Sequence, residues 1–338
     1  MIAQKHGGES YYREYRWGHT FYSDWFNESN QRDKIESLPS SELFGYPYYG
    51  LAYLREGWDE DSTFVSYRSG GSFTHHGHYD SGHITLFKGA PLLLNSSLYH
   101  GFTSENRLDY SIRTIAKNSI VIEAKDSPEL DGGQRVMLPT GSAIFSISHW
   151  LENRNKGMKL SGGEIKSYQF EDDYSYINSN LTKAYHSQWL SSSSSNQQAN
   201  SIERELFYDN LNDILVIRDR IDTAQTEQQA KLIYHTQHKP DVIQQTVLEG
   251  TLNNGIIQTT DNELKIHNGN GRLITKVFGD YSGIKLVGGN DYAFYVDGRN
   301  RADGVPNKVI ESAAKWRFEI EVAKGVDVKE IYTVHLPS

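Results

Sequence analysis

The sequence predicts an all-β protein: a large antiparallel β-sandwich followed by a smaller C-terminal β domain, with a short helical or loop lead-in. Two observations support this prediction. Tyrosine, phenylalanine and glycine are abundant, at 22, 13 and 29 residues, and this composition favours strands over helices. Short apolar runs also alternate with turn residues along most of the chain, as they do in sandwiches and barrels.

The first 45 residues differ from the rest of the chain. Residues 10–30 are rich in aromatic side chains but follow neither a strand period nor a helix period. The stretch ESLPSSELFGYPYYG, residues 36–50, then carries the proline and glycine typical of a linker. We therefore expect residues 1–45 to form a helical or loop lead-in.

Strand candidates follow in two groups. The first group includes TFVSYR, HITLFKG, NSIVIEA, SAIFSIS, GEIKSYQF, DILVIRDRID and AKLIYHT. The second, beyond Lys239, is GIIQTT, NELKIHN, GRLITKVFG, IKLVGG, YAFYVDG, KWRFEIEVA and KEIYTVHLP. These groups predict a sandwich over residues 46–240 and a small β domain over residues 241–338.

Charge and composition narrow the possible partners. The net charge of −9 argues against nucleic acid or an anionic membrane, so a polyanion would need a local basic patch. The absence of cysteine excludes disulfides and Cys-ligated metal sites. Neither a signal peptide nor a membrane span is visible in the chain. The many aromatic rings suit a sugar-binding surface, since a ring offers an apolar face to a pyranose.

Four histidines crowd into SFTHHGHYDSGHITLFKG, residues 72–89. In an extended strand His76, His78 and Asp80 would share one face and His75 would lie on the other. Gly82 would then allow a turn before His83 opens the next strand. Such a cluster fits hydrogen-bonded strand residues, a metal site or an acid–base pair.

A cupin-like metal enzyme is a minor alternative. Cupins combine His-x-His and a carboxylate on one strand with a later Pro-x-Gly and histidine. The corresponding residues here are His76, His78, His83 and Gly89, then Pro139, Gly141 and His149. The spacing from Gly141 to His149 is too long, and His83 stands where a glutamate is expected.

A more extensive resemblance involves the order of several motifs. Residues 51–101, which include the histidine cluster, precede LDYSIRTIAKNSIVIE, DGGQR, YINSNLTKAY and ERELFYDNLNDILVIRDRI. GNGRLITKVF and KWRFEIEVA follow near the C-terminus. From about Phe44 onward this arrangement resembles the β-sandwich of the heparinase II/III-like polysaccharide lyases.

The resemblance implies cleavage of a uronate-containing acidic polysaccharide by β-elimination. It makes His76 the catalytic histidine of the sandwich, with His75 beside it toward the substrate. Tyr99 and Tyr110 become candidates for the cleft, although a packed aromatic is an equal alternative for each. Arg113 could bind a substrate carboxylate or sulfate, although a structural ion pair is the commoner use of arginine.

The resemblance also implies a structural zinc site that this chain has altered. His78 matches one ligand, but the aspartate position falls at Asn95 or Ser96, and the AHN triplet reads AKN with Lys117. Because an ammonium has no lone pair to donate, we expect no zinc at this position. We expect no other cofactor either. Lys117 would fill the space and hydrogen-bond Asn95 or a backbone carbonyl. Asp80 would orient the imidazoles.

Family members share catalysis with an (α/α) toroid, and this chain has room for only the tail of one before the sandwich. We therefore expect a C-terminal piece of a periplasmic or secreted parent, with weak or no lyase activity unless it is joined to the toroid. Because family members of this architecture are often dimers, the resemblance also allows a homodimer. The alternative is a noncatalytic carbohydrate-binding or structural β module that kept the fold and lost the chemistry.

Overall fold

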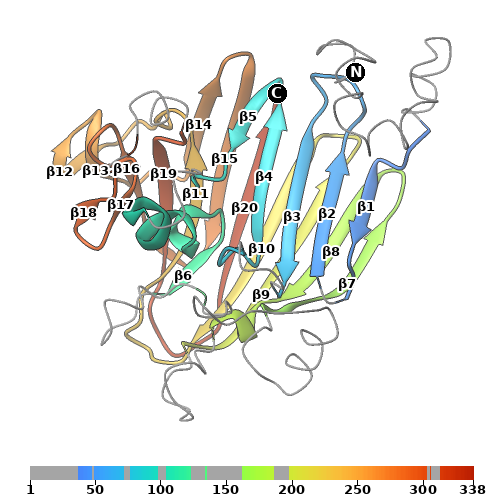
Figure 1. Ribbon diagram of the computed structural model, residues 1–338, viewed down its shortest axis with the longest axis horizontal. Coiled ribbons are helices and arrows are strands. Elements are labelled where there is room, and N and C mark those ends of the chain that lie inside the picture. The colour runs from blue at the N-terminus through green and yellow to red at the C-terminus, as the bar shows by residue number, and fades with distance from the viewer. Residues whose placement is uncertain are drawn as a thin grey trace.

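The computed structural model describes residues 37–47, 49–71, 77–97, 104–122, 134, 162–185, 198–302, 305 and 313–338. Strands make up most of these ranges (Figure 1), and all of the strand pairs are antiparallel. The predicted all-β class is confirmed. In the described part of the chain, no helix is long and apolar enough to cross a membrane.

A five-stranded sheet runs in sequence order from the N-terminal side of the described chain. Its strands are β1 (Ser41–Phe44), β2 (Tyr49–Arg55), β3 (Phe64–Gly70), β4 (His83–Lys88) and β5 (Ala90–Leu93). Strand β1 lies inside the segment expected to be a linker. That expectation was wrong there, because Ser41–Phe44 pairs with Leu51–Leu54 despite the Pro and Gly between the two strands.

A seven-stranded sheet lies behind the five-stranded one (Figure 1). Its order is β14 (Glu263–Asn268), β15 (Gly271–Gly279), β20 (Lys329–Pro337), β10 (Ile214–Thr223), β9 (Ala199–Asp209), β8 (Tyr174–Asn180) and β7 (Glu164–Phe170). Most of its strands alternate buried and less buried residues, as expected of a sheet with one face toward the core.

A six-stranded sheet completes the core. Its order is β12 (Thr246–Thr251), β13 (Asn254–Thr259), β16 (Tyr281–Gly288), β19 (Trp316–Val322), β11 (Ala230–Thr236) and β6 (Ile120–Ile122). The predicted strand YAFYVDG forms only β17 (Tyr295–Val296), which pairs with β18 (Arg299–Asn300). The predicted strand SAIFSIS, residues 142–148, lies outside the described residues.

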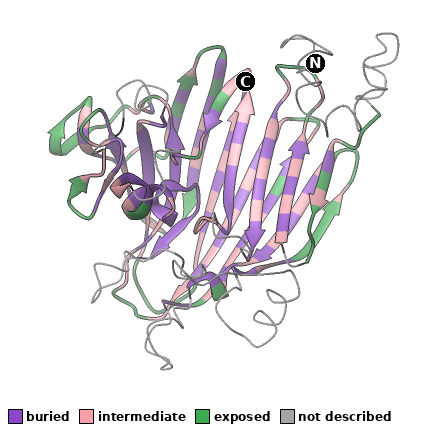
Figure 2. Cartoon of the chain, in the orientation of Figure 1, coloured by how far each residue is buried: buried purple, intermediate pink, exposed green. Residues whose placement is uncertain are grey.

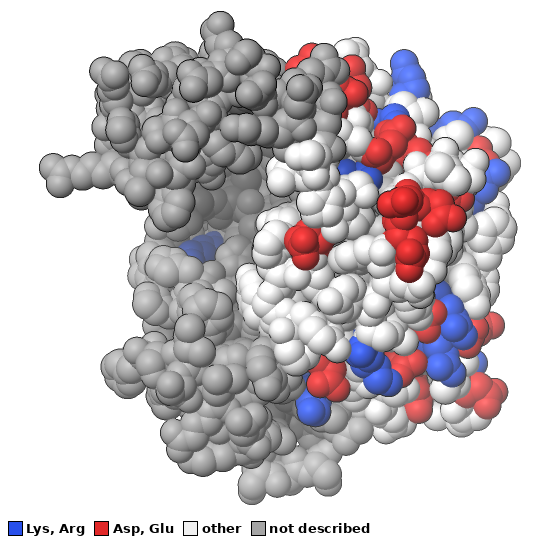
Figure 3. Space-filling view, turned by 90° about the vertical axis from the view of Figure 1, so that its right-hand side faces the viewer, with Lys and Arg blue, Asp and Glu red and all other residues white. Residues whose placement is uncertain are grey.

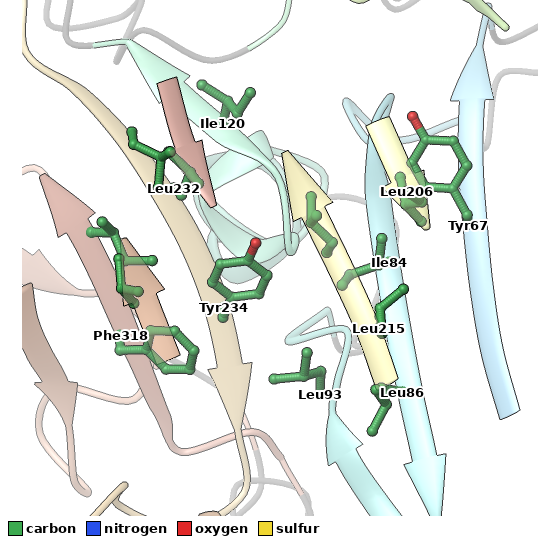
Figure 4. Packing of buried hydrophobic residues seen from close by; sticks show 14 of the residues in the cluster. Tyr67, Ile84, Leu86, Leu93, Ile120, Leu206, Leu215, Leu232, Tyr234 and Phe318 are labelled. Atoms are coloured by element: carbon green, nitrogen blue, oxygen red, sulfur yellow. The ribbon is translucent and has the colours of Figure 1, made fainter. Parts of the chain in front are cut away.

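One continuous apolar cluster joins the three large sheets. Leu206 and Leu215 of the seven-stranded sheet meet Ile84 and Leu86 of the five-stranded sheet, and Phe318 of the six-stranded sheet belongs to the same cluster (Figure 4). Bands of buried and half-buried residues alternate along β2 and β3 (Figure 2). Burial of this apolar surface is the main favourable term in folding.

The expected domain boundary near residue 240 is corrected by this arrangement. Strand β20, from the supposed C-terminal domain, pairs along its length with β10. Strand β19 likewise pairs with β11, which in turn pairs with β6. The two halves of the described chain therefore share two sheets and one core.

Acid should destabilise the fold through the buried imidazole of His335 on β20. Burial lowers the pKa of His335 from 6.5 to about 3, with Arg204 adding a smaller effect in the same direction. Its Nδ1 lies 2.9 Å from Thr275 Oγ1. Between pH 6.5 and 3 only the unfolded chain binds this proton, so stability falls as the pH drops below 6.5.

The variant His335→Gln should remove this dependence. We expect its free energy of unfolding to fall less steeply below pH 6.5, by up to about 1.4 kcal/mol per pH unit. Urea unfolding at a series of pH values measures the slope, and comparing slopes cancels any uniform loss of stability. His238→Gln, at an exposed histidine, is the control. An unchanged slope in His335→Gln would show that His335 is not a source of acid sensitivity.

Candidate functional site

The histidine-rich segment enters the described part of the chain at Gly77. His75, His76 and Tyr99, three of the predicted site residues, lie outside the described residues. Residues 77–80 are irregular rather than the expected strand, and the Tyr79 N–H donates to the Ile112 carbonyl at 2.9 Å. The segment is thus fastened to the chain just before Lys117.

A turn at Gly82 connects this segment to β4. Gly82 has φ +80°, and a Cβ at this position would lie 2.6 Å from Leu181 Cδ1, so the turn requires glycine. Its N–H donates to the Arg68 carbonyl at 2.7 Å. Strand β4 then begins at His83, as the sequence predicts.

Lys117 is the centre of a buried polar cluster. Its side chain is fully buried, and Nζ lies 2.8 Å from His78 Nδ1. Asn95 Oδ1 at 3.0 Å, the Ser111 carbonyl oxygen at 2.8 Å and Ser97 Oγ also lie within hydrogen-bond reach of Nζ, whose three N–H groups are shared among these four acceptors. The hydrogen bonds expected from Lys117 to Asn95 and to a backbone carbonyl are therefore both present.

Burial dominates the electrostatics of this lysine. Desolvation lowers the pKa of Lys117 from 10.5 to about 7, while Asp80 pulls the pKa upward and Arg68 lowers it further. When Lys117 is protonated it donates to His78 Nδ1, so the ring proton of His78 is placed on Nε2. In that protonation state of Lys117, Nε2 is the ring nitrogen of His78 that can act as a donor.

Asn118, next to Lys117, holds the surrounding strands together. Its Nδ2 donates to the carbonyls of Ile84 at 2.8 Å and Leu94 at 3.0 Å. Its Oδ1 accepts from the backbone N–H of His235 at 2.7 Å and from the ring Nδ1 of the same residue at 3.1 Å. The backbone N–H of Asn118 donates to His83 Nδ1 at 2.9 Å.

The two histidines bound to Asn118 are neutral strand residues. Burial lowers the pKa of both His83 and His235 well below 6.5, and nearby cations lower it further. His83 is therefore a hydrogen-bonded strand residue, one of the three roles considered for the histidine cluster.

Tyr110 lies in the core and not at a cleft surface. Its side chain is fully buried and packs edge-on against Phe294 at 5.4 Å. Its hydroxyl lies 3.0 Å from Ser96 Oγ and 3.4 Å from His235 Nε2, and burial raises its pKa. The prediction of a cleft position is corrected, and the alternative of a packed aromatic holds for this residue.

Arg113 forms a structural ion pair. Its Nη1 lies 2.8 Å from Asp297 Oδ2 and donates to the Asp109 carbonyl at 2.6 Å, and the residue is 9% exposed. Arg113 precedes a single helical turn, Thr114–Ala116, and is not on a strand. Of the two roles considered for Arg113, substrate binding and a structural ion pair, the structure contains the ion pair.

Asp80 pairs with a guanidinium where an imidazole was expected. Its Oδ1 lies 2.5 Å from Arg68 Nη1 on β3, and its carbonyl accepts the N–H of His83 at 3.1 Å. Asp80 therefore braces the turn before β4, and its influence on the lysine of the cluster is electrostatic.

Two further buried residues support this turn, and the sequence interpretation overlooked both. Gln134 accepts from the Ser81 N–H at 2.8 Å and donates to the Ser81 carbonyl at 2.6 Å. Arg204 on β9 donates to the Gly82 carbonyl at 2.6 Å while pairing with Asp219. Gln134 lies in DGGQR and Arg204 lies in ERELFYD. The family resemblance included both motifs but did not show that these two residues support the turn.

The zinc site implied by the resemblance does not fit the groups present. Zinc takes thiolate, imidazole or carboxylate ligands at about 2.0–2.3 Å, whereas His78 Nδ1 and Asn95 Oδ1 face an ammonium at hydrogen-bond distance. Among the described residues, no three His, Cys, Asp or Glu side chains are grouped so as to hold a metal ion.

The fold and the buried centre define an antiparallel β-sandwich in which the buried side chains of Lys117 and Asn118 hold separate strands and loops together. The family model "Heparinase II/III-like, C-terminal" matches residues 38–290. The chain belongs to this family, as the order of its motifs suggested. No curated protein sequence matches the chain.

Solved structures with the same fold include several heparinases. The heparan sulfate lyase HepC from Pedobacter heparinus superposes with a TM-score of 0.58 at 10% identity, over 97% of this chain and 40% of that one. Heparinase III gives 0.52 at 16% identity, over 88% and 37%. A heparinase III described as the BT4657 gene product, with methylated lysines, gives 0.56 at 12% identity, over 98% and 41%. The chain thus spans about two-fifths of the length of these proteins.

Proposed function

We propose that this chain is the β-sandwich part of a polysaccharide lyase that cleaves a uronate-containing acidic polysaccharide by β-elimination. The observation that carries the proposal is the family match over residues 38–290. Solved structures of the same fold named as heparinase III and heparan sulfate lyase support it. The proposal includes a helical toroid as the other half of the active site and a periplasmic or secreted location.

The reaction sets three chemical requirements. A weakly acidic carbon proton next to the uronate carboxylate must be removed, the charge that develops on that carboxylate must be stabilised, and the leaving oxygen must be protonated. We assign His76 to proton transfer or to stabilising the carboxylate, and we keep Tyr99 and His75 as further candidates for contact with the substrate. His78, Tyr79 and Asp80, a few positions further along the chain, are held by hydrogen bonds.

An acidic polysaccharide must bind against an overall charge of −9. On the face shown in Figure 3, the described surface carries acidic and basic side chains side by side, without one large basic field. Binding would therefore depend on local contacts near the histidine segment and on the toroid. The same charge argues against nucleic acid and membrane as partners.

A noncatalytic carbohydrate-binding module is the second candidate. The observation in its favour is that two residues assigned to the cleft, Tyr110 and Arg113, are used within the fold. Such a module would bind oligosaccharides without cleaving them. A homodimer is compatible with either function.

The variant His76→Ala tests the catalytic proposal in the chain joined to its helical domain. Loss of a general acid or base typically costs about 10²–10⁴-fold in rate, and we expect a drop of this size in the absorbance of unsaturated uronate product. The control is His267→Ala, at an exposed histidine on β14.

Measurements of oligosaccharide binding distinguish the lyase from the noncatalytic module. If the joined protein binds acidic oligosaccharides, yields no unsaturated product, and binds equally well after His76→Ala, the noncatalytic module is correct. Full cleavage activity in His76→Ala would remove this histidine from the mechanism while leaving the family assignment intact.

A further inference from the structure

The surroundings of Lys117 Nζ are those of a cation site. Four lone-pair atoms surround the nitrogen: His78 Nδ1, Asn95 Oδ1, Ser97 Oγ and the Ser111 carbonyl oxygen. All four are neutral acceptors, and they come from three separate segments, residues 77–80, 95–97 and 111–117. Cations bound in proteins are held by imidazole nitrogens and by oxygens of this kind.

A buried ammonium among neutral acceptors needs a structural reason. Taking a charge out of water costs several kcal/mol, and none of the four hydrogen-bond partners described for Lys117 is a carboxylate. An alanine or leucine would avoid this cost but would leave the Ser111 carbonyl without the lysine donor. The lysine instead joins segments that no continuous strand connects.

We propose that the side-chain ammonium of Lys117 occupies a position suited to a metal ion. It cross-links the three segments in place of that metal ion. The linkage fixes the side chain of His78. Asn118, the next residue, is bonded to both β4 and the chain after β5. The cross-link therefore connects residues 77–80 to the part of the sandwich around β4 and the end of β5.

The double variant Asn95→Asp with Lys117→His tests the geometry. Together with His78 these replacements supply two imidazoles and a carboxylate, a ligand set that zinc accepts. After incubation with Zn²⁺ and desalting, we expect about one zinc per chain in the double variant by metal analysis. Its melting temperature should rise with Zn²⁺ and fall with EDTA. The wild-type chain should retain no zinc, and its melting temperature should not respond to either.

The single variants are the matched controls. Asn95→Asp keeps the ammonium and should retain no zinc, and Lys117→His lacks the carboxylate and should hold zinc too weakly to survive desalting. Stoichiometric zinc in the wild type would overturn the proposal. So would a double variant with wild-type circular dichroism that binds no zinc, because the side chains would then not surround one point.

Lys117→Met tests the cross-link without any metal. Its backbone amides at Tyr79 and Ser97 should exchange with solvent faster than in the wild type, while Tyr234 in the core strand β11 remains protected. Unchanged exchange at Tyr79 and Ser97 would show that the ammonium does not fasten these segments. None of these measurements depends on lyase activity, so they can fail while the proposed function stands.

Discussion

Replacing Arg204 with methionine should cost about 3–5 kcal/mol of unfolding free energy. Arg204 and Asp219 are both completely buried between the sheets, and they pair through two bonds, Nε to Oδ1 at 2.7 Å and Nη2 to Oδ2 at 2.9 Å. Removing the arginine leaves a buried carboxylate without its partner. It also takes a donor from the carbonyls of Gly82 and Asn118.

The adjacent cross-strand pair provides a matched control. Arg218 and Glu205 occupy the same two strands one position along and face outward, with 31% and 21% of their side chains exposed. Arg218 also pairs with the partly exposed Glu330 at 2.8 Å, so Arg218→Met should cost no more than about 1 kcal/mol for each of its two pairs. Urea unfolding of the two variants measures the difference. Equal losses would mean that the buried pair contributes no more than a surface pair.

A double variant separates the pair from its surroundings. Arg204→Met combined with Asp219→Leu removes both charges, so it should lose less than the sum of the two single variants. A buried ion pair can often be replaced by apolar side chains at little cost, whereas removal of one partner is strongly destabilising. Strict additivity would show that the two side chains act independently.

The strand content could be predicted because its signal is local. Alternation in DILVIRDRID predicts β10, and the same pattern predicts β15 and β20. Strand β12 was not predicted, because all of its residues are exposed and it carries no alternation. Strand β1 was hidden by neighbouring Pro and Gly residues, since turn residues mark the ends of a hairpin as well as a linker.

The domain boundary could not be predicted because pairing is not local. Period-two alternation shows that a strand has a buried face, but it does not say which strand lies beside it. Strands β10 and β20 pair although more than 100 residues separate them, as in Leu215 opposite His335. The break between the two groups of strand candidates near Lys239 therefore marked a connection within one sandwich.

Within the site, the family resemblance predicted which residues contact one another, because their positions follow from the order of the motifs. It brought His78, Asn95 and Lys117 together, and their side chains do meet. It could not distinguish a cleft arginine from a structural one at Arg113, because the deciding partner, Asp297, comes from a distant loop. The roles of His75, His76 and Tyr99 remain predictions.

Asn118 is the residue whose loss should most directly separate the five-stranded sheet from the six-stranded one. Its side chain bonds Ile84 of β4 and Leu94 after β5 on one side, and His235 of β11 on the other. Asn118→Ala leaves two carbonyls and two N–H groups without these partners. Each such loss costs about 1–3 kcal/mol when the group is buried, so we expect a total loss of at least about 3 kcal/mol in urea unfolding.

An exposed asparagine, Asn200, shows whether the loss of stability in Asn118→Ala comes from burial or from the amide group alone. Asn200→Ala removes two hydrogen bonds, to Asp222 and to the Thr223 carbonyl, from an exposed asparagine. Water can replace these hydrogen bonds, so the free energy of unfolding should fall by only about 0.5 kcal/mol. Asn118→Asp keeps the acceptor for His235 but cannot donate to Ile84 and Leu94, and it buries a charge. It should therefore be no more stable than Asn118→Ala. If Asn118→Asp matches the wild type instead, the amide donors do not hold the two sheets together.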